Sequence, residues 1–205
     1  MAIPVIYEDN WLLVVNKPPG LLTIPSPKEK NRTLIKILNE DLKKKGAAFS
    51  LHACHRLDRH TSGLIILAKG KSIQQKMMQE FKKKAVNKVY IAVVDGLLAK
   101  AQGEINTPLS GKSALTRYKA ICRFKDFSVL RVSPLTGRKN QIRLHFKQIG
   151  HPVIGESRFA FRRDFKIKSK KLCLHAQGLR FLHPVTGKEI HLETELPAYF
   201  NRFLK

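Results

Sequence analysis

Short runs of β-branched and large apolar residues alternate along this chain with segments in which apolar residues recur every three or four positions. The first pattern is typical of buried β-strands and the second of amphipathic helices. Only the polar residues 8–10 separate the first two runs, which favours a hairpin, and the KPPG at 17–20 predicts a turn. In all, the runs predict strands over residues 3–7, 11–16, 63–70, 88–96, 115–123, 127–133, 172–174, 178–182 and 189–193.

Helical spacing occurs in three segments of the chain. Residues 138–150 end at Gly150, a residue type favoured at helix C-termini. Ser72 and Gln75 have the spacing of a capping box, which predicts a helix beginning there and ending in the KKKA at 82–85. Helices segregated from many strands indicate an α+β fold with a largely antiparallel sheet. The apolar faces are Leu34, Ile37 or Leu38, and Leu42 in residues 33–45; Ile73, Met77 and Phe81; and Ile142, Phe146 and Ile149.

The charge balance narrows the choice of partner. The 205 residues include 39 Lys+Arg but only 15 Asp+Glu, so the formal net charge is +24, although 43% hydrophobic residues is ordinary for a globular protein. Such an excess repels itself and is best tolerated against a polyanion. Nucleic acid is therefore the leading partner, ahead of a ribosomal or membrane-surface role.

Cysteine usage and the first residues indicate the compartment. Cys54, Cys122 and Cys173 are odd in number, far apart and form no Cys-x-x-Cys pair, which favours a reducing cytosol. The chain begins without the basic and then apolar pattern of a signal peptide, and no apolar run approaches the ~18 residues that cross a bilayer. We therefore expect a cytoplasmic protein with no membrane partner.

Motifs that would imply a bound cofactor fail on their spacing. The GKS triplets at 70–72 and 111–113 would each need a glycine five residues earlier to form a phosphate loop, but Ile65 and Asn106 stand there. The cysteines and histidines lack the paired spacing of a zinc site. We expect no nucleotide cofactor and no metal. The metal-ligand types considered are His52, Cys54, His55, His60, Cys173 and His175.

The segment HRLDRHTSGLIILAKG, residues 55–70, places the single carboxylate Asp58 among arginines and histidines. One interpretation is a polar turn ending in Thr-Ser-Gly. The other is a carboxylate that neighbouring cations keep ionised, ready to act as a nucleophile or base. Composition alone leaves both open.

The sequence of this segment resembles the signature of the RluA family of pseudouridine synthases, in which His-Arg-Leu-Asp, Thr-Ser-Gly and an apolar strand ending in Ala-Lys recur. The likeness extends in order over nearly the whole chain, which makes it specific. The other similar blocks are residues 5–25, 87–96, 133–146, 151–155 and 172–190.

The resemblance implies the pseudouridine synthase fold, a mixed and mostly antiparallel sheet flanked by helices and loops, with a central active-site cleft. It also implies isomerisation of uridine to pseudouridine in rRNA or tRNA by a flipped-base mechanism that uses no cofactor. By the same resemblance, Asp58 is the catalytic carboxylate, Arg143 its salt-bridge partner and Tyr90 the ring that stacks on uracil. RNA contacts are expected from Arg56, His55, Lys88, Ile142, Arg138, Arg162 and Arg163. Taken without the family, Tyr90 and Ile142 could be core residues and Arg143 a surface cation of its helix.

Three positions depart from the family pattern. Asn140 stands where the family usually has His, Glu156 where it has Asp, and Phe159 where it has Tyr. We expect these changes to affect secondary RNA contacts and target choice, and to leave the Asp–Arg–Tyr set untouched.

We expect residues 1–205 to form a single catalytic domain, acting as a monomer, without the small N-terminal RNA-binding domain that some family members carry. RNA must then be held by the catalytic domain, and the basic segment 158–171 is expected to close on it. The alternative is a non-catalytic RNA-binding or ribosome-assembly protein that retains the fold.

Overall fold

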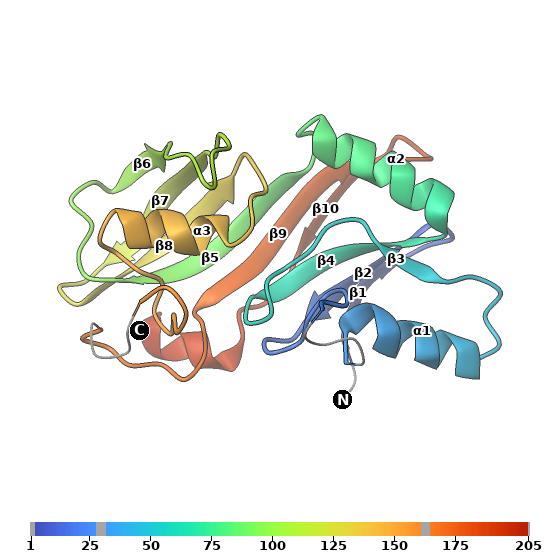
Figure 1. Cartoon of the computed structure of the whole chain (residues 1–205), viewed down its shortest axis with the longest axis horizontal. Coiled ribbons are helices and arrows are strands. Elements are labelled where there is room, and N and C mark those ends of the chain that lie inside the picture. The colour runs from blue at the N-terminus through green and yellow to red at the C-terminus, as the bar shows by residue number, and fades with distance from the viewer. Residues whose placement is uncertain (1–2, 28–31, 161–164, 205) are drawn as a thin grey trace. The chain divides into compact units, whose positions relative to one another are not determined.

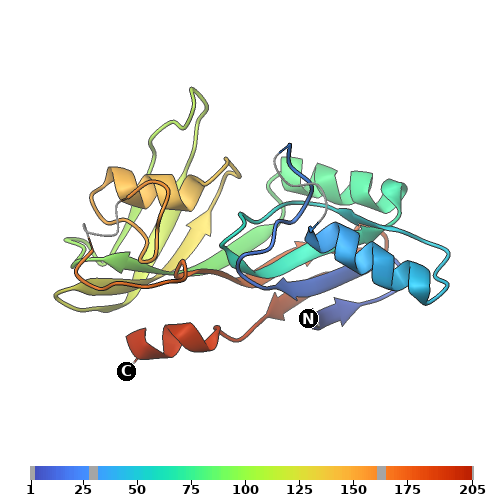
Figure 2. The ribbon, with the colours of Figure 1, turned by 60° about the horizontal axis from the view of Figure 1, so that its bottom comes forward.

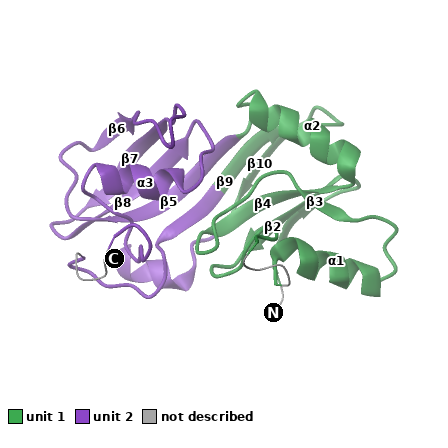
Figure 3. Cartoon of the chain, viewed as in Figure 1, with its two compact units in different colours: residues 1–86, 178–194 green, residues 87–177, 195–205 purple. Residues whose placement is uncertain are grey.

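A computed structural model describes residues 3–27, 32–160 and 165–204. The chain forms two compact units, and each unit is built from two separate stretches of sequence (Figure 3). The first unit comprises Met1–Val86 and Gly178–Thr194, and the second comprises Asn87–Gln177 and Glu195–Lys205.

The first unit is built on antiparallel strand pairs (Figure 1). The predicted hairpin is confirmed, because β1 pairs antiparallel with β2, and β2 in turn pairs with β4 along its full length. β3 also pairs with β4, and β10 pairs with residues 178–182 of β9. The bounds are β1 Val5–Glu8, β2 Leu12–Lys17, β3 Leu51–Ala53, β4 Ser62–Lys69, β9 Leu174–Leu182 and β10 Glu189–Glu193.

Two helices cover this unit's strands, α1 (Leu34–Lys44) against β3 and α2 (Lys71–Lys82) against β3 and β4 (Figure 1). The Thr33 side chain caps α1, accepting a hydrogen bond from the backbone N–H of Lys36 at 3.3 Å. The predicted capping box at Ser72 is wrong, because α2 begins one residue earlier and has Gly70 at its N-cap. The apolar face of α2 is confirmed. Ile73 and Met77 are buried in a core with residues of β2, β4, β9 and β10, and Phe81 packs against it.

The second unit holds a four-stranded antiparallel array in the order β5-β8-β7-β6. The helix α3 lies against β7 and β8 (Figure 1). Its Phe146 ring meets the Tyr118 ring of β7 edge-on, with 5.7 Å between the ring centroids. A separate core contains Val93, Val129 and Phe200. The bounds are β5 Asn87–Asp95, β6 Gln102–Ile105, β7 Thr116–Arg123, β8 Phe127–Pro134, α3 Gln141–Gln148 and the 3₁₀ helix η2 Ala198–Phe203.

The predicted α+β class with a largely antiparallel sheet is confirmed, but some element assignments are wrong. The strands predicted at 172–174 and 178–182 form one nine-residue strand, β9, that runs from the second unit into the first. The sequence patterns missed β3, β6 and η2, which are three to six residues long and too short for a clear period. Among the described residues, no helix is long and apolar enough to cross a membrane.

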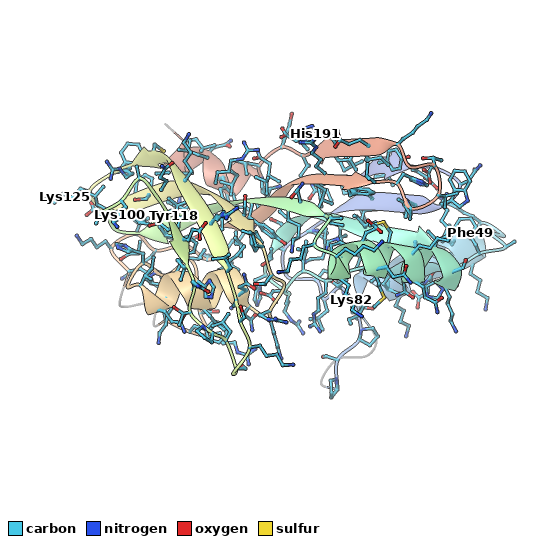
Figure 4. All side chains as sticks on the ribbon, turned by 90° about the horizontal axis from the view of Figure 1, so that it is seen from above. Phe49, Lys82, Lys100, Tyr118, Lys125 and His191 are labelled. Atoms are coloured by element: carbon cyan, nitrogen blue, oxygen red, sulfur yellow. The ribbon has the colours of Figure 1, made fainter. Side chains whose placement is uncertain are left out.

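Many of the excess positive charges lie at the surface of the units. Lys82 of α2 in the first unit, and Lys100 and Lys125 in the second, are exposed (Figure 4). Within the basic segment 158–171, Arg162 and Arg163 lie outside the described residues, whereas Phe165 is buried in the core of the second unit. The described part of this segment is therefore anchored by an apolar side chain.

Candidate active site

Asp58 lies half-buried in the loop between β3 and β4 of the first unit. Its carbonyl accepts a hydrogen bond from the Thr61 N–H at 3.2 Å, which closes a tight turn. The neighbouring Leu57 is held by Thr23, whose Oγ1 accepts from the Leu57 N–H at 3.2 Å and donates to the Leu57 carbonyl at 3.1 Å. One threonine hydroxyl therefore satisfies both polar backbone groups of the residue before Asp58.

The residue after Asp58 is held from the same stretch of chain. The Arg59 carbonyl accepts from the Gly20 N–H at 2.8 Å and from the Lys17 Nζ at 3.2 Å. The Lys17 ammonium also donates to the carbonyls of Pro18 at 3.0 Å and Leu21 at 2.8 Å. Residues 17–23 thus bracket Asp58 on both sides through backbone contacts.

Lys17 is fully buried, with 0% of its surface exposed. Burial lowers the pKa of its ammonium to about 7, while the charge of Asp58 acts in the opposite direction and that of Arg59 adds to the lowering. Lys17 thus lies close enough to Asp58 for the two charges to interact within the first unit. The sequence interpretation missed it, because KPPG was treated only as a turn, although Lys17 falls inside the matched block 5–25.

The predicted RNA-contact residues of this loop have different surroundings. Arg56 is exposed to solvent. His55 Nε2 accepts the Ile66 N–H of β4 at 3.0 Å, and its ring lies 4.8 Å from that of Phe81. His55 therefore has a place in the fold of this unit, and its proposed contact with RNA stays a prediction.

Tyr90 and Lys88 both lie on β5 of the second unit. Tyr90 is 9% exposed and is paired with Val132 of β8 in the strand register. Lys88 is half-buried, and burial lowers the pKa of its ammonium.

Arg143 is the third residue of α3, within its first turn, and is 5% exposed. Its Nε donates to Glu156 Oε2 at 2.6 Å and its Nη2 to Glu156 Oε1 at 2.8 Å, a bidentate ion pair. Its Nη1 donates to Asn140 Oδ1 at 3.0 Å, and the Phe159 ring lies 5.0 Å from its Cζ. Burial acts to raise the pKa of the Glu156 carboxyl, but hydrogen bonds from Arg143 and the Arg158 backbone N–H outweigh it and lower that pKa.

These contacts correct one expectation from the sequence. Asn140, Glu156 and Phe159 are the three departures from the family pattern, and all three touch the Arg143 guanidinium. The expectation that they leave the Asp–Arg–Tyr set untouched is therefore wrong for Arg143.

The start of α3 is fixed by the Gln141 side chain. Its Oε1 accepts from the Thr136 hydroxyl at 2.7 Å and from the Arg138 N–H at 2.9 Å. Its Nε2 donates to the Leu115 carbonyl and to Thr116 Oγ1, both at 3.0 Å. The helix that carries Ile142 and Arg143 is thus tied to the two loops around it, while Arg138 is itself exposed.

The structure describes Asp58 in one unit and Tyr90, Ile142 and Arg143 in the other. The pairing of Asp58 with Arg143 therefore stays a prediction. Each unit by itself holds one polar residue fixed by several hydrogen bonds. In the first unit it is Asp58, which lies near the buried Lys17. In the second unit it is the buried Arg143. Over the described ranges 3–27, 32–160 and 165–204, no group of three or more His, Cys, Asp or Glu side chains is placed to hold a metal ion.

Comparison with known proteins agrees with this fold and these blocks. The profile of the family described as RNA pseudouridylate synthase matches residues 11–148. The dual-specificity RNA pseudouridine synthase RluA of Yersinia pestis is 35% identical over 93% of this chain and 98% of its own. The ribosomal large subunit pseudouridine synthase C of Rickettsia bellii is 36% identical over 96% of this chain and 69% of its own. The solved structure of human RNA pseudouridylate synthase domain containing 4 has a TM-score of 0.78 at 23% identity, covering 96% of this chain and 90% of that one, which supports the fold.

The chain belongs to the RNA pseudouridylate synthase family. It is an RNA-modifying isomerase that converts uridine in RNA into pseudouridine.

Proposed function

We propose that this enzyme isomerises specific uridines of rRNA or tRNA without a cofactor, using Asp58 as the catalytic carboxylate. The observation that carries the proposal is the half-buried Asp58 whose neighbours on both sides are hydrogen-bonded to residues 17–23. The relatives' names support the choice of RNA, because one is named for dual specificity and another for the large ribosomal subunit.

The reaction needs no net change in composition. The target nucleotide leaves its stack, and Asp58 starts cleavage of the bond between ribose C1′ and uracil N1. The uracil then turns, a bond forms from C1′ to ring carbon C5, the C5 proton leaves and N1 gains a proton. Product and substrate are isomers, which is why neither an oxidant nor a nucleotide cofactor is required.

The other residues have roles suited to their chemistry. Arg143 pairs with the Asp58 carboxylate, Tyr90 stacks on the uracil, and Ile142 lines the apolar side of the uracil site. Arg56 takes the place of the flipped base or holds its flanking phosphate. His55, Lys88 and Arg138 contact the RNA, as do Arg162 and Arg163 of the segment 158–171, which closes on it.

RNA binding rests mainly on charge. The net charge of +24 favours docking on a polyanion and disfavours self-association, so we propose a monomeric enzyme. In this proposal the two units act as one catalytic domain, and the enzyme works in the cytoplasm, where its RNA substrates are.

The central test is Asp58→Ala, assayed for pseudouridine formation and for RNA binding. We expect binding to remain within about threefold, while product formation falls by more than roughly 10³-fold because the reacting carboxylate is gone. Asp41→Ala removes an exposed carboxylate from α1 of the same unit and should leave both measurements unchanged. A variant lacking Asp58 that keeps its turnover would overturn the assignment.

Assays of RNA binding and pseudouridine formation by the wild-type protein distinguish catalysis from binding alone. If it binds rRNA and tRNA but forms no pseudouridine in any cellular RNA, the protein is the non-catalytic alternative. Pseudouridine maps of total RNA from cells with and without the gene identify the modified positions, and a position lost without the gene names the substrate.

Substitutions at Tyr90 test whether its ring stacks on the uracil. Tyr90→Phe keeps an aromatic face and should retain substrate binding, whereas Tyr90→Leu should weaken productive binding by roughly tenfold, within the range of base–aromatic stacking. Equal behaviour of the two variants would remove stacking from the proposal.

A further inference from the structure

The Arg143 guanidinium is held at three sides by one carboxylate, one amide and one ring. Glu156 takes the edge formed by Nε and Nη2, and the Asn140 oxygen takes Nη1. These contacts bind three of the five N–H donors that a guanidinium carries. The plane and direction of the group are therefore set by side chains of the second unit.

Glu156 is itself fixed by the backbone that follows it. Its Oε1 accepts the backbone N–H groups of Ser157 at 2.9 Å, Arg158 at 2.7 Å and Phe159 at 3.3 Å. The carboxylate side chain is 0% exposed. Its position therefore depends on the path of the main chain, and Arg143 takes its position from Glu156.

A buried ion pair of this kind is sensitive to the loss of one partner. Removing the Glu156 carboxylate takes away the buried partner of two guanidinium donors, and the cation then moves or attracts water. A displacement of about 1 Å at a reacting group can lower a rate by roughly 10²-fold. Loss of Glu156 should therefore act on the chemical step through the placement of Arg143.

The departures from the family pattern strengthen this inference. The three changed positions, 140, 156 and 159, are scattered along the sequence but surround a single guanidinium. All three side chains therefore belong to the support of Arg143.

We propose that Glu156 is a positioning residue of the isomerisation, which holds the Arg143 guanidinium in the orientation that the reaction requires, with Asn140 and Phe159 completing the same support. The proposal rests on the role given to Arg143 under the proposed function.

The test is a double-mutant cycle on single-turnover rates with saturating RNA, using Glu156→Gln, Arg143→Lys and the double variant. Gln keeps the shape of Glu156 and removes its charge. We expect Glu156→Gln to lower the rate about 10- to 100-fold with little change in RNA affinity. In the Arg143→Lys background the same change should lower the rate by less than about threefold, because its effect passes through the guanidinium. Glu104→Gln, which removes the acidic partner of the exposed Arg117 in the same unit, is the matched control and should leave the rate unchanged.

The outcomes separate this proposal from the proposed function. An unchanged rate in Arg143→Lys and in Arg143→Ala would overturn the role of Arg143 itself. A slow Arg143→Lys combined with a Glu156→Gln effect that multiplies fully in the double variant would overturn only the positioning role. A purely structural contribution of Glu156 would give such full multiplication, because it would reduce the fraction of folded enzyme in either background.

Glu156→Asp keeps the test available if Glu156→Gln does not fold. The shorter carboxylate should lower the rate roughly tenfold when it is the only change, since it withdraws from Arg143. A Glu156→Asp variant that folds and keeps the wild-type rate would overturn the positioning role.

Discussion

Asp58 and Arg143 are held in place in different ways. The loop of Asp58 is fixed mainly through its backbone, by hydrogen bonds from Thr23, Gly20 and Lys17 to the residues on either side. Arg143 stands on a helix and is fixed through its side chain, by Glu156, Asn140 and Phe159.

The difference predicts where each centre is vulnerable. A loop held through carbonyl and N–H groups keeps its path when its own side chains change, but depends on the few residues that donate to it. A guanidinium held by side chains depends on the identity of every partner. Substitutions of the residues that hold the Asp58 loop should therefore act mainly on folding stability, and substitutions of the side chains that hold Arg143 mainly on the rate.

The largest effect is expected from Gly155→Ala. Gly155 has φ of +82°, and a Cβ there would lie 2.0 Å from the Lys171 carbonyl oxygen, so the backbone must shift. We expect a loss of about 4 kcal/mol in the free energy of unfolding, from overpacking and the left-handed backbone together. Urea unfolding measures it. Because Glu156 is the next residue, the folded fraction should also be slow, and a stable variant of normal rate would contradict the close approach.

Lys17→Met should have the next largest effect, about 3 kcal/mol, because three backbone carbonyls lose the Lys17 amine that donates to them. Lys43→Met, which removes an exposed lysine from α1, is the control and should change stability by less than about 0.5 kcal/mol. Equal stability of the two variants would show that the buried ammonium does not hold the Asp58 loop.

Lys17 also predicts the direction in which the free energy of unfolding changes with pH. Its pKa is about 7 in the folded protein, against the ordinary lysine value of 10.5 that applies to the unfolded chain, so between these values the unfolded chain binds more protons than the folded one. Stability from this group is therefore fully present above about pH 10.5 and is lost as pH falls toward 7. The difference in unfolding free energy between wild type and Lys17→Met should widen as urea titrations move from pH 7 to pH 9. A constant difference would contradict the lowered pKa.

Thr23→Val should cost about 2 kcal/mol, since the Leu57 N–H and carbonyl both lose their partner. Thr23→Ser keeps the hydroxyl and should retain most of the stability, although it loses a methyl group. Thermal unfolding of the three proteins distinguishes them. A Ser variant as unstable as the Val variant would mean that the methyl group, and not the hydroxyl, braces the loop.

The smallest effect is expected from Gly20→Ala, and it sharpens the comparison with Gly155. Gly20 also has a positive φ, +88°, but a Cβ there meets nothing within 4 Å. Only the backbone strain of about 1 kcal/mol should remain, and the hydrogen bond to Arg59 should survive. A loss as large as that of Gly155→Ala would show that the turn at 17–20 is as tightly packed as the one at 155.

The sequence predicted the long elements well and the supporting contacts poorly. The hairpin of β1 and β2 and the helix α2 followed from local patterns, because their apolar residues repeat over enough positions. β9 was divided in two because its burial on both faces gives no alternation, and Gly178 lies in its middle. Asp58 was singled out by its motif and its charge contrast.

The supporting contacts of Lys17 and Glu156 could not be predicted from the sequence for a physical reason. Each acts through partners far away in the chain, Arg59 and Arg143, and no local period records such a contact. The signal that could have found them was chemical. A lysine that ends a mostly apolar strand, and an acidic residue beside a glycine in a chain with few carboxylates, both need a partner when they are buried.

The division of each unit into two stretches bears on how the chain is made. The core of the first unit combines Leu12 and Leu64 with Leu179 and Ile190, which are translated much later. Residues 70–177 are synthesised in between, which takes roughly 10 s at typical translation rates. During that interval β2 and β4 wait with one part of their apolar surface uncovered. The first unit can therefore be completed only after its second stretch is translated, and a nascent chain that stalls before residue 179 is a natural client for a chaperone.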